Sequence, residues 1–370
     1  KKLAKKIEKK LYKEINNLIE ISKFAGERFD LVQSAGGNSS VKLNNGNMLI
    51  KSSGVTLSDL NFNFGFTKVN NKKIKLILNS KKILKIKNKK KKEFLSQKLL
   101  KRANLEKKSS PSIEVFLHSL LNKVTLHTHP ICVNNVVCSP NWKKNLNKIF
   151  NNSNYLFVKY KSPGIELALE LKKEVEKYFL INKLLPKIIF FQNHGLVVTD
   201  STTKKVIELT NYITLEIEKF IKADYSTYRL TNKISGLVRK TYKDKNLIAY
   251  LSEDKIINDK ILNKKFLFSK PTCPDTFVFN GIKPCNLKSL HDELNLRKFK
   301  KKYKSFSKVL IFRKNIFLIN KSVKKAKSME EMLKFHLLVM KKLYDKPLYL
   351  LDKEMRYLSN LETEKYRQNI

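Results

Sequence analysis

Strand-like and helix-like segments alternate along this chain, and that alternation limits its possible folds more than any other feature. The strand-like segments are residues 31–43, 48–54, 124–130, 155–160 and 187–200. The helix-like segments are residues 2–24, 112–122, 131–140, 164–179 and 201–222. Lysine-rich alternation at residues 68–95, with Asn79 and Ser80 as turn residues, indicates a surface β-hairpin. Such a chain is expected to form layered α/β structure and not an all-helical or all-β fold.

The C-terminal third carries a pattern of its own. A polar, lysine-rich stretch at residues 233–265 is the expected boundary between two domains. Residues 308–320 are expected to form a β-hairpin and residues 328–343 a helix, which is enough for a small α/β appendage. We therefore expect a first domain at residues 1–240 and a C-terminal appendage at residues 241–370.

The composition is that of a globular protein of a reducing compartment. Of 370 residues, 42% are hydrophobic, which supplies a substantial core. No run reaches the roughly 18 apolar residues of a membrane-spanning helix, and the N-terminus lacks the apolar block of a signal peptide. The four cysteines form no CxxC pair and are too few for a disulfide framework in a chain of this length. We expect a cytoplasmic protein with no membrane partner.

The formal net charge of +45 raises the question of an acidic macromolecular partner. A balance this basic is typical of proteins that bind nucleic acid or anionic membranes. Here the excess is mostly lysine, is spread along the chain and accompanies abundant asparagine and isoleucine, so we favour codon composition as its cause. Arginine, which makes bidentate contacts with phosphate and guanine, is scarce beside lysine. We do not expect nucleic-acid binding, whereas small anionic substrates would be attracted.

Three of the six histidines are placed where they could bind one metal ion. His127 and His129 are two residues apart at the end of a strand, so their side chains project from the same face. His194 lies in a strand turn before Gly195, which lets the backbone bend beside the ring. Three histidines that leave one position open describe a catalytic zinc site, although a single histidine is as often a hydrogen-bonded core residue.

A glutamate at a helix start and two glycine-containing loops are further candidates for functional residues. Glu114 lies in the first turn of an expected helix, where acids usually cap the helix or face its dipole. The loops at residues 36–39 and 52–54 read as ordinary glycine turns, or as nests of backbone N–H groups and hydroxyls for a phosphate or carboxylate.

The ordered motifs GGNSS, LIKSSG, SPSIE, HTHP and QNHG resemble the class II aldolase/adducin family over about residues 5–225. The wording LVQSAGGNSSVK, PSIE and LHTHP is most similar to the aldolase half of bifunctional rhamnulose-1-phosphate aldolase/lactaldehyde dehydrogenase proteins. Segments CPDTFVFNG (residues 273–281), the hairpin around Asn315 and LETEKYR (residues 361–367) resemble the C-terminal appendage of that half. We expect no dehydrogenase half within these 370 residues.

The resemblance implies a fold and a set of roles. It implies a three-layer α/β/α domain with a mainly antiparallel central sheet. It assigns His127, His129 and His194 to a divalent metal ion, expected to be zinc, and Glu114 to acid/base chemistry. The phosphate-binding residues it implies are Gly37, Asn38, Ser53, Gly54 and Ser112. This chain has Ile113 where the fuculose-phosphate enzymes have a second serine, which removes one phosphate hydroxyl.

The activity implied is retro-aldol cleavage of a sugar, expected to be a ketose phosphate, through a zinc-stabilised enolate. For Glu114 to accept and return a proton efficiently, burial would have to raise its pKa toward neutrality. Members of this family form cyclic homotetramers, often with a tyrosine donated by the neighbouring subunit, which the sequence does not identify among 14 tyrosines.

Three other functions stay open at this point. A dehydratase or epimerase of the same superfamily would use the same enolate chemistry on a related sugar or sugar-acid phosphate. An adducin-like interaction module would keep the fold without catalysis, but adducins are expected to lack the histidine ligands. A lysine-driven nucleic-acid binder would show a steep dependence of affinity on salt.

Overall fold

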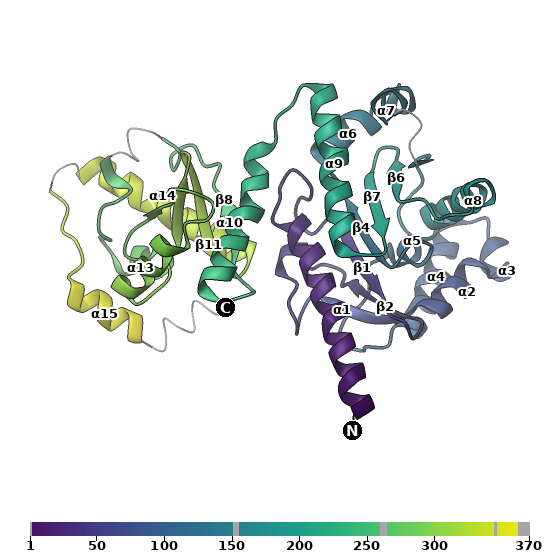
Figure 1. The fold of residues 1–370 in the computed structure, drawn as a ribbon, viewed down its shortest axis with the longest axis horizontal. Helices are drawn as coiled ribbons and strands as arrows, with labels where there is room; N and C mark the ends of the chain where they lie inside the picture. Colours follow the sequence, from purple (N-terminus) through teal and green to yellow (C-terminus); the bar gives the residue numbers. More distant parts are fainter. Residues whose placement is uncertain (1, 151–154, 260–264, 344–345, 362–370) are drawn as a thin grey trace. The chain divides into compact units, whose positions relative to one another are not determined.

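The computed structural model describes residues 2–150, 155–259, 265–343 and 346–361 (Figure 1). The chain forms two compact units, Lys1–Tyr225 and Ser226–Ile370. The division expected at residue 240 lies inside helix α10 (Ser226–Tyr242), whose buried residues Ile234 and Val238 belong to the core of the C-terminal unit. The N-terminal unit therefore ends before this helix, and the assignment of functional domains stays a prediction.

A seven-stranded sheet forms the centre of the N-terminal unit, in the order β3-β2-β1-β4-β7-β6-β5. Every neighbouring pair is antiparallel except β5 and β6. The strands are β1 (Asn38–Lys42), β2 (Asn47–Lys51), β3 (Phe66–Asn70), β4 (Val124–Thr128), β5 (Tyr155–Val158), β6 (Ile188–Phe191) and β7 (Gly195–Asp200). The first two strands form the expected hairpin around Gly46.

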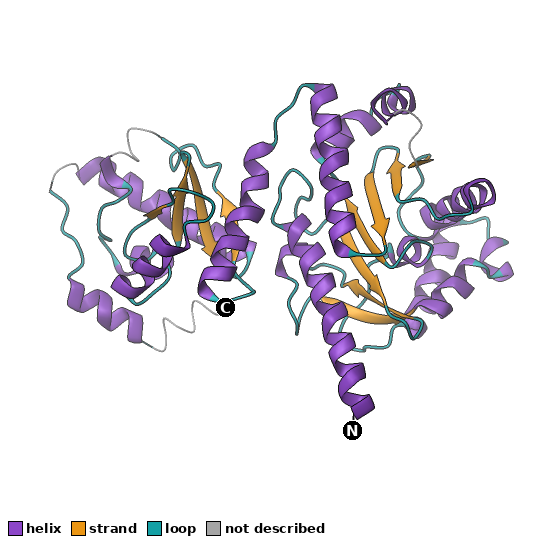
Figure 2. Ribbon diagram, in the orientation of Figure 1, coloured by secondary structure: helices purple, strands orange, loops and turns teal. Residues whose placement is uncertain are grey.

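Helices cover both faces of this sheet, as Figure 2 shows. One face packs against α1 (Lys2–Gly26), α6 (Ile131–Val137), α7 (Trp142–Phe150) and α9 (Thr203–Ile221). The other packs against α2 (Asn71–Leu78), α3 (Lys81–Leu84), α4 (Lys89–Ala103), α5 (Val115–Ser119) and α8 (Ile165–Asn182). Along β7, Val198 joins the first core and Val197 the second, because successive strand residues face opposite sides. The expected three-layer α/β/α arrangement with a mainly antiparallel sheet is confirmed.

The prediction of a β-hairpin at residues 68–95 is wrong, because only the first residues of this segment are extended, in β3. The rest forms α2, α3 and the first part of α4. In α2, Ile74, Ile77 and Leu78 are buried at helical spacing. Each helix begins after a residue whose side chain accepts a backbone N–H three residues later, and these caps are Asn70, Ser80 and Asn88. Asparagine and serine favour both turns and helix starts, and here the helix start is formed.

The C-terminal unit has a four-stranded sheet in the order β8-β11-β10-β9. Its strands are β8 (Ile248–Leu251), β9 (Cys285–Asn286), β10 (Val309–Phe312) and β11 (Asn315–Asn320). Helices α10 and α13 (Glu293–Tyr303) share one core with the sheet, and α14 (Val323–Leu343) shares another. The expected hairpin at 308–320, helix at 328–343 and small α/β appendage are confirmed, whereas LETEKYR lies almost entirely outside the described residues.

Among the helices that the structure describes, none is both long and apolar enough to cross a membrane.

Candidate metal site

The three histidines singled out in the sequence converge at one end of the central sheet. His127 lies in β4, His129 follows the strand, and His194 lies in the turn between β6 and β7. Their candidate ligand atoms all lie within 4.8 Å of one another. The ring centroids are 4.9 Å apart for His127 and His129, 4.8 Å for His127 and His194, and 5.2 Å for His129 and His194.

Close backbone packing brings His194 to the other two rings. Strands β4 and β7 pair with Thr128 opposite Leu196, so the turn before β7 lies beside the end of β4. A Cβ atom on Gly195 would lie 2.4 Å from the carbonyl oxygen of Thr128, and only glycine permits this approach. Asn193, with φ of 53°, completes the turn in the left-handed region that asparagine tolerates.

The nitrogen atoms of this cluster are those that a metal ion would use. Within the part of the chain that the structure describes, Nε2 of His127 and Nε2 of His129 are buried and have no hydrogen-bond partner. Burial, followed by the neighbouring His127 and His194, lowers the pKa of His129 to about 3. His129 is therefore neutral at physiological pH and its lone pair is free. The residues present fit a divalent ion, because buried nitrogens seldom stay without a partner.

Glu114 joins the histidines at the start of α5. Its side chain is buried, and Oε2 lies 2.9 Å from Nδ1 of His127 while Oε1 lies 3.2 Å from Nε2 of His194. Asn38, the first residue of β1, donates a hydrogen bond from Nδ2 to Oε2 of Glu114. The bond from Nδ1–H of His127 to Glu114 leaves Nε2 of that ring as the metal-facing atom, an arrangement common around ligating histidines.

The electrostatics of Glu114 differ from the expectation of a pKa near neutrality. Burial alone would raise the pKa of this carboxyl, but the charge and hydrogen bond of His127, together with those of His194, hold it well below its usual value. In the structure, Glu114 is therefore an ionised carboxylate that can accept a proton. The sequence could not show this, because the contacts come from three separate strands and turns.

The structure places the five residues assigned to phosphate in two groups. Gly37, Asn38 and Ser112 lie beside the histidine and Glu114 cluster: a Cβ on Gly37 would lie 2.9 Å from the carbonyl oxygen of His127, and Oγ of Ser112 accepts the backbone N–H of Glu114 at 3.3 Å. Ser53 and Gly54 are exposed in the turn after β2. That turn is tied to the segment before Ser112 by the bond from the Ser53 N–H to the Ser110 carbonyl, 2.9 Å long.

One lysine at the site was not distinguished among the many lysines of the sequence. Lys51, the last residue of β2, is 2% exposed and donates from Nζ to the carbonyl oxygen of Ala35 at 3.1 Å. Burial lowers its pKa to about 8, and the Glu114 carboxylate opposes this shift. Its place at the end of the apolar run MLIK, directly before SSG, is the signal that could have revealed it.

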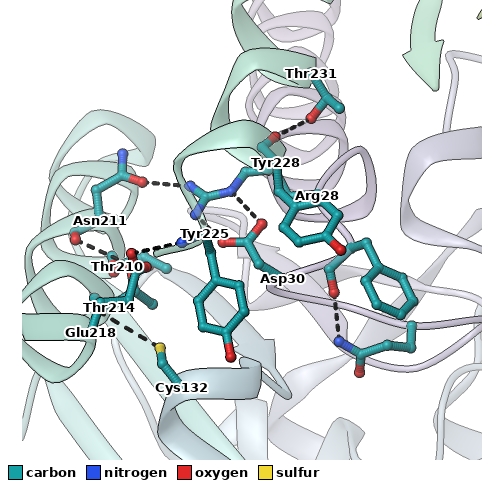
Figure 3. A network of polar contacts seen from close by, with 12 residues as sticks. Arg28, Asp30, Cys132, Thr210, Asn211, Thr214, Glu218, Tyr225, Tyr228 and Thr231 are labelled. Atoms are coloured by element: carbon teal, nitrogen blue, oxygen red, sulfur yellow. Dashed lines mark hydrogen bonds and ion pairs between the residues drawn. The ribbon is translucent and has the colours of Figure 1, made fainter. Parts of the chain in front are cut away.

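A buried ion pair supports the segment that leads to the histidine cluster (Figure 3). The guanidinium of Arg28 makes two hydrogen bonds to the carboxylate of Asp30 and donates from Nη1 to Oδ1 of Asn211 in α9 at 2.6 Å. The ion pair is almost completely buried, with both side chains 2% exposed. These bonds fix the loop between α1 and β1 against α9.

That loop in turn holds the backbone around His129. The N–H of His129 donates to the carbonyl of Leu31 at 3.0 Å, and the N–H of Ile131 donates to the carbonyl of Asp30 at 2.9 Å. The Arg28 and Asp30 pair therefore lies directly behind the backbone that presents His129. No sequence pattern predicts this support, because Asn211 is far from Arg28 and Asp30 in the chain.

The sheet, its two helical layers and the convergent histidines form an α/β domain with a candidate site for a divalent metal. A comparison with protein-family models matches residues 16–216 to the Class II Aldolase and Adducin N-terminal domain. That match covers more than half of the chain and includes all three histidines and Glu114. The chain belongs to the class II aldolase and adducin family, and the family named from its motifs is confirmed.

A comparison with solved structures finds the following similar chains. The N-terminal class II aldolase domain of a conserved protein from Thermoplasma acidophilum is 25% identical and has a TM-score of 0.47, with 56% of this chain and 93% of that chain covered. YgbL from Klebsiella pneumoniae, a putative aldolase/epimerase/decarboxylase, is 15% identical, with a TM-score of 0.39 and coverage of 57% and 89%. A sugar-phosphate aldolase from Thermotoga maritima is 12% identical, with a TM-score of 0.42 and coverage of 57% and 95%. No curated protein matches the chain.

Proposed function

We propose that this chain is a zinc-dependent class II aldolase that cleaves a ketose phosphate by retro-aldol chemistry. The observation that carries the proposal is the joint position of four side chains. His127, His129 and His194 offer ring nitrogens within 4.8 Å of one another. Glu114 is hydrogen-bonded to Nδ1 of His127, which leaves Nε2 of that ring for an ion. Family membership supports a reaction of the aldolase and epimerase type, and the retained histidines argue against an adducin-like module without catalysis.

His127, His129 and His194 would hold the ion, and three nitrogen donors with an open position suit zinc. A divalent ion in that place would supply positive charge beside the oxygen on which negative charge develops when the bond β to a carbonyl breaks. The neutral state of His129 keeps its lone pair available for this purpose.

Glu114 would move the proton. As the carbon–carbon bond breaks, its carboxylate takes the proton of the substrate hydroxyl that becomes the aldehyde. It then returns that proton to the carbon that carried the broken bond, which balances the reaction without another reactant. The low pKa of Glu114 keeps the carboxylate ionised before the reaction and favours the second of these transfers, the return of the proton to carbon. The bond from Asn38 to Oε2 orients the carboxylate between two histidines.

The phosphate of the substrate would bind beyond Glu114, at Ser112, Ser53 and Gly54. The backbone at Gly54 has φ of 76° and open space around it, so its N–H can approach an anion closely. Lys51 adds a buried positive charge near this group. The predicted phosphate contact of Asn38 is compatible with its bond to Glu114, because the Nδ2 group carries two N–H donors.

A screen of ketose phosphates tests the proposed reaction, with products identified by mass spectrometry. The zinc-loaded protein is expected to release an aldehyde and a ketone phosphate from at least one substrate, and the metal-stripped protein to release neither. An isomeric product or loss of water would instead assign the epimerase or dehydratase chemistry of the same family. We further propose a homotetramer, which light scattering of the purified protein would test.

A further inference from the structure

Two hydrogen bonds run side by side from strand β1 to helix α5. Asn38 donates to the carboxylate of Glu114, and Oγ of Ser40 lies 2.7 Å from Nδ1 of His118. Residues two apart on a strand lie on one face about 6.6 Å apart, and residues four apart on a helix are stacked about 6 Å apart. The spacing of the strand pair therefore matches the spacing of the helix pair.

His118 is completely buried and has a defined protonation state. Its pKa is lowered to about 3, first by burial and then by His127, so the ring is neutral. Among the described residues, Nε2 of His118 has no hydrogen-bond partner. A buried N–H group without an acceptor is rarer than an unused acceptor, so the hydrogen belongs on Nδ1, where it is donated to Ser40.

Helix α5 cannot fix its own position. It has five residues, and no side chain caps its first turn. Helices this short are unstable in isolation, because their few internal hydrogen bonds do not offset the entropy of nucleation. The position of Glu114 at the beginning of α5 therefore depends on the contacts that anchor the helix to the sheet.

We propose that His118 and Ser40 are positioning residues, which anchor α5 so that Glu114 stays within hydrogen-bond distance of His127 and fixes its tautomer. The inference rests on the proposed function in so far as Glu114 and His127 act at that site. With α5 anchored, Nδ1–H of His127 donates to Glu114 and Nε2 of His127 is free to face an ion. Without the anchor, His127 would populate both tautomers and bind metal less tightly.

The chain offers a matched control on the opposite face of the same strand. Ser39 lies between Asn38 and Ser40 and points toward α1, where its Oγ lies 2.7 Å from Oγ of Ser22. Both Ser39 and Ser22 are fully buried. Ser22→Ala therefore removes a buried hydrogen bond to β1 of the same length as that of Ser40, but on the face that does not contact α5.

The test measures Co2+ affinity by competition titration for the wild type and for His118→Leu, His118→Asn, Ser40→Ala and Ser22→Ala. We expect His118→Leu to weaken Co2+ binding by about tenfold or more, as loss of outer contacts to a ligating histidine does. His118→Asn should stay within about threefold of the wild type, because its amide N–H can replace Nδ1–H as the donor to Ser40. Ser40→Ala should weaken binding, and Ser22→Ala should leave it unchanged.

A second readout does not depend on metal. The long-range 1H–15N spectrum of metal-free, histidine-labelled protein reports the tautomer of His127. It should show Nδ1–H in the wild type and in His118→Asn, and a mixture of tautomers in Ser40→Ala. If His118→Leu does not fold, the inference is tested by comparing the Co2+ affinity and the His127 tautomer of Ser40→Ala with those of Ser22→Ala.

Wild-type Co2+ affinity in His118→Leu, or equal effects of Ser40→Ala and Ser22→Ala, would overturn the inference. A wild-type protein that binds Co2+ but cleaves no sugar phosphate would contradict the proposed function alone. The positioning role would then still be decided by the affinities and by the tautomer of His127.

Discussion

Nδ1 of His127 and Oε2 of Glu114 lie 2.9 Å apart in the interior of the N-terminal unit, so one carboxylate both orients a metal-facing ring and remains ionised. The contact joins β4, the central strand of the seven-stranded sheet, to the start of a helix on one of its faces. It links the two functions predicted separately from the sequence, metal binding by His127 and proton transfer by Glu114.

Replacing Glu114 with glutamine separates these two functions. Glu114→Gln keeps an oxygen that can accept from His127 but cannot take a proton at neutral pH. We expect the variant to retain metal at saturating zinc and to lose turnover by about 10²- to 10⁴-fold, the usual contribution of a general acid/base. Single-turnover rates with metal content measured on the same sample provide the check. A variant as active as the wild type would remove Glu114 from the mechanism.

Lys51 predicts a pH dependence of stability. Its pKa is about 8 in the folded chain, against 10.5 for a free lysine. Between these values the unfolded chain binds more protons, so the free energy of unfolding should rise with pH through this window. In Lys51→Met this part of the rise is expected to disappear.

Guanidinium unfolding of the metal-free protein between about pH 8 and pH 10.5 measures this difference. Lys101→Met, which changes an exposed lysine of α4, is the control and should keep the pH dependence of the wild type. Parallel curves for Lys51→Met and the wild type would mean that Lys51 stays charged when buried.

Removal of the Arg28–Asp30 ion pair, which supports the backbone at His129, is expected to lower both the stability of the protein and its metal affinity. Arg28→Met leaves the Asp30 carboxylate buried without its partner, which costs about 3–5 kcal/mol of unfolding free energy. The loop that holds the His129 backbone should then loosen, so we expect zinc affinity to fall as well. Urea unfolding and zinc competition assays check the two effects.

A second ion pair in the same layer provides the comparison. Lys123 pairs with Glu14 of α1 at 2.6 Å, but Lys123 is partly exposed and Glu14 also accepts from Asn17. Lys123→Met should therefore cost less, about 1 kcal/mol or below, and leave zinc affinity unchanged. Equal zinc affinities for Arg28→Met and Lys123→Met would show that the Arg28 pair contributes to stability but not to zinc binding.

Gly195 predicts a steric effect on His194. Because a Cβ atom there would lie 2.4 Å from the carbonyl of Thr128, Gly195→Ala must displace the turn that carries His194. Zinc affinity is expected to fall by at least about tenfold, since ligand geometry is held by such contacts. Gly236→Ala in α10 meets nothing within 4 Å and should stabilise the protein by about 0.5–1 kcal/mol. Wild-type zinc affinity in Gly195→Ala would show that the turn adjusts to the added methyl group without displacing His194.

The sequence predicted those parts of the site that depend on local spacing. His127 and His129 share a face because they are two residues apart at a strand end, and His194 stands at a turn marked by glycine. The sheet, its main helices and the C-terminal hairpin were predicted from periodicity for the same reason. The tie between Glu114 and His127 followed only from family resemblance, since no short-range pattern joins them.

Other features depend on long-range packing and could not be predicted. Residues 68–95 indicate a hairpin by their alternation and by Asn79 and Ser80 as turn residues, but burial of Ile74 and Ile77 at helical spacing favours helices there. Lys51 is one of many lysines, and in the sequence only its place at the end of the apolar run MLIK points to its burial. His118 was not singled out either, since its partner Ser40 is remote in the sequence.

Metal content per subunit tests the central claim most directly. We would measure it by plasma mass spectrometry on the purified wild type and on a folded His129→Ala variant, both after reconstitution with zinc and removal of excess ion. The account predicts about one ion in the wild type and little in the variant, because three nitrogens within 4.8 Å become two. No specifically bound ion in the wild type, or the same content in both proteins, would contradict it.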